Sequence, residues 1–253
     1  MYAEERQQQI LTAVETRGRV SVTELAQHFD VATETIRRDL DALDRQGLLA
    51  RVHGGAIPRR TRDIEPDLGQ RLSTNTEAKR AIAAAASRFI PTGSDATVLL
   101  DAGSTTVEMI PHLDGHDLRI VTNSLPIAEA ALSISCAGVH ILPGVVRGLT
   151  RAAVGVDTVK ALSRLHPDVA FIGCNGMGED GFTTPDPDEA AGKSAIVAGA
   201  RRRIVLADSS KSGVSQLVTF AELDEVDVLV TDSHLPDSHL HTFTDSGIEV
   251  VRA

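Results

Sequence analysis

The stretch VLLDAGSTTVEMI (98–110) contains the unit from which most of the chain is built. The apolar run 98–100 predicts a buried strand, the small residues 101–106 predict a loop, and the amphipathic run 107–110 predicts the start of a helix. A loop of this kind gathers backbone N–H groups and hydroxyls at the positive end of a helix. The stretch therefore predicts a phosphate-binding loop, for a phosphate that is either transformed or sensed.

The same alternation of apolar runs and helical patterns continues on both sides of this stretch. A helix is expected from Thr76, and further helical patterns separate the later apolar runs. Strands separated by helices predict an α/β fold with a mostly parallel sheet covered on both faces. The expected strands are ATVLL, LRIVT, GVHIL, DVAFIG, RRIVLAD, VDVLVTD and IEVV.

Small residues, hydroxyls, an amide and a few cations follow these expected strands. Ligands of such sheets bind just past the carboxyl ends of the strands. Backbone N–H groups and lysine suit a phosphate, whereas Asp and Asn suit sugar hydroxyls, so the loops predict a polyol-phosphate pocket. The candidates are Asp101, Gly103, Ser104, Thr105, Thr106, Asn123, Ser124, Gly144, Arg147, Asn175 and Lys211.

Each of these candidates also has a simpler explanation. DAGSTT alone is compatible with an ordinary strand-to-helix turn. Lys211 alone is compatible with a solvated surface lysine, and Arg147 with a structural partner of an acid. Only their combination favours a ligand site.

Charge is distributed unevenly along the 253 residues, whose formal net charge is −10. Residues 1–62 contain ten arginines and nine acidic residues, which leaves 15 basic and 26 acidic residues for the rest of the chain. A small basic segment is thus attached to a large acidic body. Such a segment is typical of nucleic-acid binding.

The basic segment has the pattern of a winged helix-turn-helix. Ser21 is placed to cap a short helix, 30–32 form a turn, and a third helix begins near Thr33 with apolar residues on one face. LLARVHGGAI (48–57) predicts a strand, a turn and a strand, which is a wing. The alternative is a generic three-helix module with solvated arginines. The residues expected to contact DNA are Thr33, Thr35, Arg37, Arg38, Arg51 and His53.

The stretch ATETIRRDLDALDRQGLLARVHGGA (32–56) resembles the signature of the DeoR/GlpR family of bacterial repressors. The resemblance extends to DAGSTT, TNS, LPG with Arg147, GFTTPDPDEAAGK and VLADSSKSG, and so covers nearly the whole chain. It implies a winged helix-turn-helix followed by an effector domain similar in fold to ribose-5-phosphate isomerase and CoA transferases. It also implies pocket roles for Glu189 and Lys193. Asp39 matches the motif as well, but its place on the helix predicts a structural partner for a nearby arginine. The chain departs from the family pattern at 176–178 and at Gly192.

These observations predict a DNA-binding repressor of a carbohydrate catabolism operon, controlled by a phosphorylated sugar or polyol. The expected domains are 1–57 for DNA, 58–75 as a linker and 76–253 for the effector. The alternative is a sugar-phosphate isomerase with an accessory DNA-binding head, because carboxylates and a lysine also move protons. An architectural DNA binder with a vestigial pocket is the third possibility. We expect a regulator and no enzyme, because a winged helix adds nothing to catalysis.

The composition and spacing of residues also argue against a metalloprotein, a secreted protein and a membrane protein. Cys136 and Cys174 lie far apart without metal-ligand spacing, and Pro111 disfavours a helical metal pair of His112 and His116, so neither a metal nor a cofactor is expected. The polar N-terminus is not a secretory signal, and no apolar run is long enough for a membrane span. We expect a cytoplasmic homodimer or homotetramer.

Overall fold

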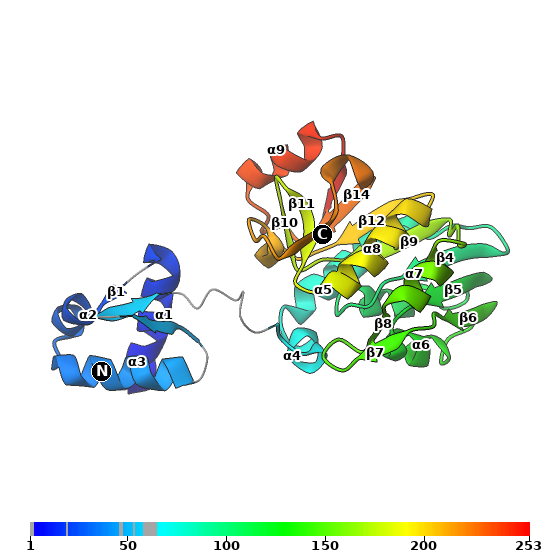
Figure 1. The fold of residues 1–253 in the computed structure, drawn as a ribbon. Coiled ribbons are helices and arrows are strands. Elements are labelled where there is room, and N and C mark those ends of the chain that lie inside the picture. Colours follow the sequence, from blue (N-terminus) through cyan, green and yellow to red (C-terminus); the bar gives the residue numbers. More distant parts are fainter. Residues whose placement is uncertain (1–2, 19, 46–47, 53, 58–64) are drawn as a thin grey trace. The chain divides into compact units, whose positions relative to one another are not determined.

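The computed structural model describes residues 3–18, 20–45, 48–52, 54–57 and 65–253. The chain divides into two compact units, Met1–Glu65 and Pro66–Ala253, and each is described by itself (Figure 1). No helix in the described part of the chain is long and apolar enough to cross a bilayer. These same residues contain no group of three or more side chains arranged to hold a metal ion.

Three helices of the first unit pack around one aliphatic core. Ser21 starts the second of them, because its hydroxyl accepts a hydrogen bond from Glu24 N at 3.1 Å. Asp30 ends this helix in the left-handed region, with φ of 52°. The turn and the next helix then form the predicted helix-turn-helix. The helices are α1 (Ala3–Arg17), α2 (Val22–Phe29) and α3 (Thr33–Arg45).

A small antiparallel sheet completes the first unit, in the order β1 (Val20–Ser21), β3 (Gly55–Ile57) and β2 (Ala50–Val52). β2 and β3 pair as the predicted wing, and β1 holds β3 next to the start of α2. Gly55 permits this approach, since a Cβ there would lie 2.0 Å from the carbonyl oxygen of Val20. The wing is therefore fixed to the helix-turn-helix by backbone packing.

A seven-stranded parallel sheet forms the centre of the second unit, and it confirms all seven predicted strands. The chain starts in the middle of the sheet, builds outward to one edge, and returns to build toward the other. The order therefore reverses between β4 and β9, and the loops after these two strands diverge into a crevice that suits a ligand. The strands, in spatial order, are β15 (Glu249–Arg252), β14 (Val228–Thr231), β12 (Arg203–Leu206), β9 (Val169–Gly173), β4 (Ala96–Leu100), β5 (Leu118–Thr122) and β6 (Gly138–Ile141).

Helices cover both faces of this sheet (Figure 1). Alternate residues of β4 point to opposite faces, so Val98 and Leu100 pack in one core cluster and Leu99 in the other. The first face is covered by α5 (Thr76–Ala86), the 3-10 helices η1 (Ser87–Phe89) and η2 (Thr106–His112), and α6 (Leu125–Ala131). The second is covered by α7 (Val156–Leu162), α8 (Pro187–Gly199) and α9 (Asp237–Asp245).

Several short elements escaped the sequence analysis. They contain three or four residues each and are rich in Gly, Ala and Thr, so they carry no apolar period. The strands among them are the ribbon of β7 (Val145–Arg147) and β8 (Ala152–Val154), and the sheet of β10 (Gly176–Gly178), β11 (Gly181–Thr184) and β13 (Val218–Ala221). The 3-10 helices are η3 (Ser209–Lys211) and η4 (Leu223–Glu225).

The segment 58–75, predicted as a linker, contains the helix α4 (Leu68–Ser73). A capping box of Asp67 and Gln70 starts this helix, and the backbone N–H of Leu68 donates to Leu149 O at 3.0 Å. Six residues are too few to show a helical period, which is why the sequence pattern did not indicate it.

The helix expected after DAGSTT is the 3-10 helix η2, which includes Pro111. Its seven residues form a tighter and less regular helix than the α-helix that the phosphate argument assumed. The predicted helix start after this loop is therefore present, as a 3-10 helix.

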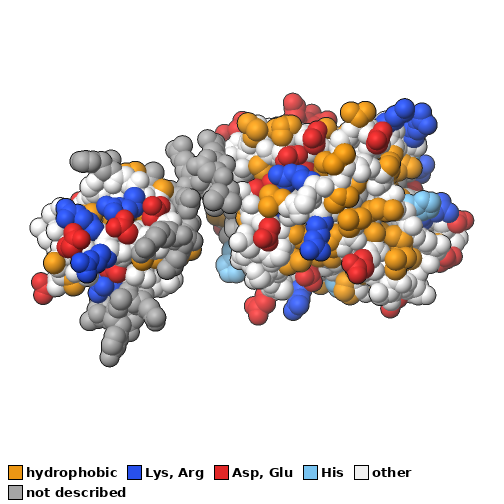
Figure 2. Space-filling model, turned by 60° about the horizontal axis from the view of Figure 1, so that its bottom comes forward, with side chains coloured by type: hydrophobic (Ala, Val, Ile, Leu, Met, Phe, Trp, Pro, Cys, Tyr) orange, Lys and Arg blue, Asp and Glu red, His pale blue; other side chains and the backbone are white. Residues whose placement is uncertain are grey.

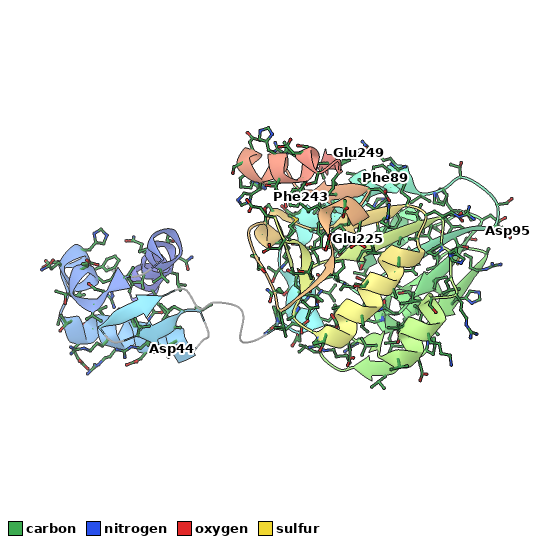
Figure 3. All side chains as sticks on the ribbon, turned by 45° about the horizontal axis from the view of Figure 1, so that its top comes forward. Asp44, Phe89, Asp95, Glu225, Phe243 and Glu249 are labelled. Atoms are coloured by element: carbon green, nitrogen blue, oxygen red, sulfur yellow. The ribbon has the colours of Figure 1, made fainter. Side chains whose placement is uncertain are left out.

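Charged side chains cover the β15 edge of the large sheet. Glu249 accepts from Arg88 at 2.7 Å and from Arg202 at 3.3 Å. Both guanidinium groups lie over the ring of Phe89, at 4.8 and 4.6 Å from its centroid (Figure 3). Charges of this kind protect an edge strand from pairing with another chain.

Candidate functional site

The helix α3 buries one face and exposes the other, as the sequence predicts. Ile36, Leu40 and Leu43 are at most 2% exposed. Thr33, Arg37 and Arg38 are exposed on the opposite side, and Thr35 is half-buried. Glu34 lies 3.3 Å from Arg37 Nη1 and 3.9 Å from Arg38 Nε, so it holds both guanidinium groups near the start of the helix. The four candidate side chains of α3 therefore share one helical turn and a half.

Two further charged pairs stabilise the first unit. Asp39 is buried and accepts from Arg6 Nε at 2.6 Å and from Gln7 Nε2 at 3.0 Å, which confirms its structural role. Arg51 of the wing binds Asp41 of α3. The candidate His53 lies outside the described residues.

In the second unit, the candidate effector residues surround a buried ion pair between Asp101, which follows β4, and Lys193 of α8. Asp101 Oδ2 also accepts from the N–H of Gly173 at 3.1 Å, and Lys193 Nζ donates to Gly173 O at 2.8 Å. Burial raises the pKa of Asp101, and the ammonium of Lys193 opposes this increase. The two charges thus fix α8 to the crevice between β4 and β9.

Asn123, Ser124 and Thr106 hold the loop 101–106 in shape. Asn123 Oδ1 accepts from Ala102 N at 2.9 Å, and Ser124 caps α6. Thr106 Oγ1 donates to Asp101 O at 2.6 Å and lies within 3.0 Å of Gly103 O. A Cβ on Gly103 would lie 2.9 Å from this hydroxyl, so a larger residue here would displace Thr106. The structure thus brings these candidates together, and their hydrogen bonds mainly hold the backbone of the loop in place.

Glu189 of α8 is the centre of a second polar group. It contacts Thr150 and lies 3.3 Å from Arg147 Nη1, while Arg147 Nε lies 3.1 Å from Asp186. This arrangement matches the structural explanation of Arg147, as a partner of acidic residues.

The remaining two framework candidates also face protein groups. Gly144 has φ of 142°, and a Cβ there would lie 2.2 Å from Thr158 Oγ1. Asn175 Oδ1 accepts from Thr184 Oγ1 at 3.1 Å. Their contacts shape the loops after β6 and β9.

Three candidates at the same end of the sheet have side chains without a protein partner among the described residues. Ser104 and Thr105 are at most 8% exposed, yet neither hydroxyl forms a hydrogen bond within that part of the chain. Lys211, half-buried at the end of η3, forms no ion pair there either. Its ammonium acts on the Cys174 thiol together with Lys193, Asp208 and Asp101, so these charges converge on one region. Two hydroxyls and one ammonium therefore remain to bind an anion.

The sequence analysis did not name two polar residues with buried or interloop contacts as candidates, Asn75 and Lys79. Asn75 Nδ2 donates to Asp208 Oδ1 at 3.1 Å, and Lys79 Nζ donates to the carbonyls of Arg71 and Thr74. Burial lowers the pKa of Lys79, which is only 4% exposed. One signal was present, because Lys79 precedes Ile82 and Ala83 by three and four residues and so occupies the buried stripe of α5.

Burial raises the pKa of the Cys174 thiol to about 12. Only about one molecule in ten thousand then carries the reactive thiolate at pH 8. We expect the Cys136→Ser variant not to react with a disulfide reagent until it is unfolded. The Cys174→Ser variant, which retains the half-buried Cys136, is the control. Rapid labelling of native Cys136→Ser would contradict this environment.

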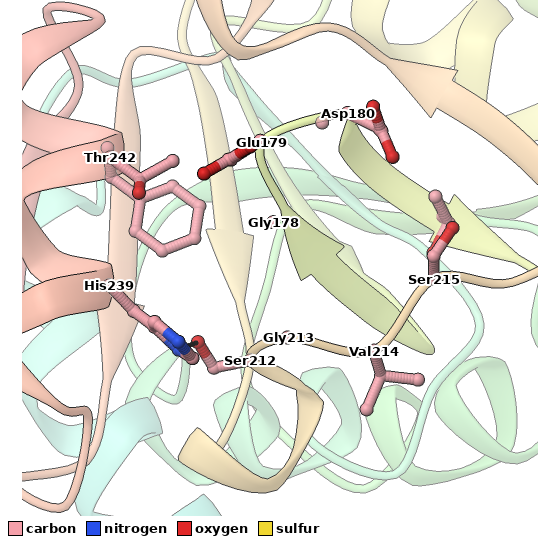
Figure 4. Close-up of a pocket in the computed structure, with 12 residues that line it drawn as sticks. Gly178, Glu179, Asp180, Ser212, Gly213, Val214, Ser215, His239 and Thr242 are labelled. Atoms are coloured by element: carbon pink, nitrogen blue, oxygen red, sulfur yellow. Dashed lines mark hydrogen bonds between the residues drawn. The ribbon is translucent and has the colours of Figure 1, made fainter.

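A cavity of about 270 Å³ lies between the β10–β11 hairpin, the loop 212–215 and α9 (Figure 4). His239 Nδ1 lies 2.6 Å from Ser212 Oγ on one wall, and Glu179 and Asp180 lie at the hairpin. None of the candidate effector residues lines it. It therefore lies beside the site and does not form it.

The family comparisons match this architecture. Residues 6–61 match the DeoR-like helix-turn-helix domain, and residues 74–233 match the DeoR C terminal sensor domain. The chain is 36% identical over 254 residues to the HTH-type transcriptional regulator GlpR of Haloferax volcanii, covering 99% of this chain and 98% of that protein. It is 33% identical over 250 residues to the glycerol-3-phosphate regulon repressor of Escherichia coli, covering 97% of each.

Among solved structures, ribose 5-phosphate isomerase A of Methanocaldococcus jannaschii matches with a TM-score of 0.39 and 17% identity, over 55% of each chain. The sequence relatives are named as transcriptional regulators. The predictions of a helix-turn-helix, a parallel α/β domain and a regulator are thus confirmed. With both domain models matched in order and relatives aligned over almost its whole length, the chain belongs to the DeoR family of transcriptional regulators.

Proposed function

We propose that this regulator binds operator DNA through residues 1–57 and a phosphorylated sugar or polyol through residues 76–253, with 58–75 joining the two. The observation that carries the proposal is the set of unpaired groups of Ser104, Thr105 and Lys211. Two hydroxyls and an ammonium that have no partner among the described residues suit a phosphate dianion, which accepts several charge-assisted hydrogen bonds.

The neighbouring residues suit the rest of the ligand. The framework of Asp101, Asn123 and Lys193 lies where the sheet order reverses, the usual position of a small ligand in this kind of sheet. In this proposal Asp101 and Asn123 face sugar hydroxyls. The full proposed effector set is Asp101, Gly103, Ser104, Thr105, Thr106, Asn123, Ser124, Gly144, Arg147, Asn175, Glu189, Lys193 and Lys211.

A phosphorylated sugar or polyol as the ligand also agrees with the name of one relative. The name of the Escherichia coli relative, glycerol-3-phosphate regulon repressor, refers to a phosphorylated polyol. We transfer only the class to this chain, together with a role in repressing genes of carbohydrate catabolism in the cytoplasm.

Thermal unfolding of the full chain with a panel of phosphorylated sugars and polyols tests this proposal. A ligand that binds only the folded state raises the unfolding temperature by linkage. We expect one phosphate ester to raise it selectively, and its unphosphorylated counterpart to leave it unchanged. An absence of any shift across the panel would argue against a phosphate-ester sensor.

On the DNA side, Thr33, Thr35, Arg37, Arg38, Arg51 and His53 form the proposed contact set. The start of α3 enters the major groove in this arrangement, and the wing follows the backbone. Two copies of the chain, as a homodimer or homotetramer, would read the two halves of a symmetric operator.

Replacing Arg38 by alanine is expected to weaken binding to a duplex selected by the full chain from random sequences. Loss of a base contact costs about 1–3 kcal/mol, whereas loss of a phosphate contact weakens binding to all sequences and lowers the salt slope of the affinity by about one. Arg201→Ala removes the same charge from a similarly exposed position of the second unit and serves as the control. Equal losses in the two variants would indicate a general charge effect in place of a contact by α3.

A further inference from the structure

The two edges of the large sheet differ in character. Salt bridges cover the β15 edge. The β6 edge, in contrast, has no strand partner on its outer side among the described residues. Exposed aliphatic side chains surround it, and we call this set the β6-edge surface: Leu125, Leu132, Ile141, Val145, Val146 and Val156.

The exposure of these side chains is large. Leu132 is 76%, Val145 74% and Val156 82% exposed. Nine large hydrophobic residues of the described chain are exposed, and six of them belong to the β6-edge surface, so the exposure is concentrated in one region. Figure 2 shows hydrophobic side chains gathered on the face that lies below in Figure 1, where α6, β6 and β7 are labelled.

The elements that carry this surface are neighbours. α6 packs against β5 and β6, and the bridge between Ser124 and Ala152 joins its start to β8. The hydroxyl of Thr158 in α7 donates to Pro143 O at 2.7 Å, between β6 and β7. Monomers seldom expose a contiguous apolar patch of more than a few hundred Å².

We propose that the β6-edge surface binds the same surface of a second copy of this chain. The choice of partner rests on the proposed operator binding, because one helix-turn-helix reads only one half of a symmetric site. A two-fold interface must be self-complementary. Around the surface both charge signs are exposed, with Arg119 and Arg151 on one hand and Glu129 and Asp157 on the other. A two-fold axis therefore allows opposite charges to meet at the rim while the aliphatic centres pack together.

Sedimentation of the full chain over a range of concentrations tests the surface. Leu132→Glu and Ile141→Glu each bring two charges into such an interface, one from each copy. We expect the wild type to sediment as a dimer or a multiple of a dimer, and each variant to dissociate at a concentration at least 100-fold higher. Leu217→Glu is the matched control, because Leu217 is 77% exposed outside this surface and its change should leave association intact.

A monomeric wild type at all concentrations would overturn the proposal, as would unchanged association of Leu132→Glu and Ile141→Glu. Thermal shifts by the phosphate esters separate this result from the proposed function. Unchanged association with a retained ester shift would refute the surface and leave the sensor intact. Dissociation of the two variants without an ester shift in any protein would support the surface and count against the sensor.

Discussion

Replacing Asp101 by alanine is expected to lower the free energy of unfolding by about 3–5 kcal/mol. In this variant the ammonium of Lys193, which is 4% exposed, has lost its counter-charge. It still donates a hydrogen bond to the Gly173 carbonyl. A buried charge that loses its partner costs far more than the pair contributed. Chemical denaturation of the second-unit transition measures the loss.

The double variant Asp101→Ala/Lys193→Met removes both charges and should recover most of this stability. Glu249→Ala provides a second control, because its ion pairs with Arg88 and Arg202 are about half exposed and each surface pair contributes at most about 1 kcal/mol. If the double variant were no more stable than the single one, the uncompensated lysine would not be the cause.

The second large effect is expected on effector binding. Lys211→Ala should weaken the phosphate ester identified by thermal shift by about 10- to 100-fold, since a charge-assisted hydrogen bond is worth roughly 1.5–3 kcal/mol. Calorimetric titration of the wild type and the variant measures this change. Stability without ligand should stay nearly constant, because Lys211 has no ion pair within the described residues to lose.

Lys160→Ala removes a lysine from an exposed position on α7 and controls for the overall charge. Ester affinity that is equal in Lys211→Ala and Lys160→Ala would remove Lys211 from the phosphate site. Operator affinity without ester should be unaffected in both variants.

The sequence predicted the large sheet well, because a strand buried on both faces needs a continuous apolar run such as 98–100 or 204–206. It did not predict the β10–β11–β13 sheet. Gly176 shows why. A Cβ added at this position would lie 2.2 Å from Val214 O, so glycine is required here by a segment 38 residues later in the chain. Long-range contacts of this kind leave no local period.

The candidate site was predictable in its location and less so in its roles. Loops after parallel strands meet at one edge, so the positions of Asp101, Asn123 and Lys211 could be inferred from topology. The sequence could not distinguish Asp101, which pairs with Lys193, from Ser104, which has no partner in the described part of the chain, because that difference depends on α8. Asn75 and Lys79 precede β4, the first strand of the large sheet along the chain. Candidates chosen from the loops after the strands of this sheet therefore could not include them.

The helix α4 is attached at both ends to loops of the proposed effector site. Its first N–H binds Leu149, next to the Thr150 that contacts Glu189, and Asn75 just beyond its end binds Asp208 in the Lys211 loop. α4 is the first helix of the second unit, and it joins both loops as a tether. Binding equilibria that share such a tether are reciprocal. In the proposed function, an operator whose binding alters α4 changes the affinity for the phosphate ester by the same factor by which the ester changes the affinity for the operator.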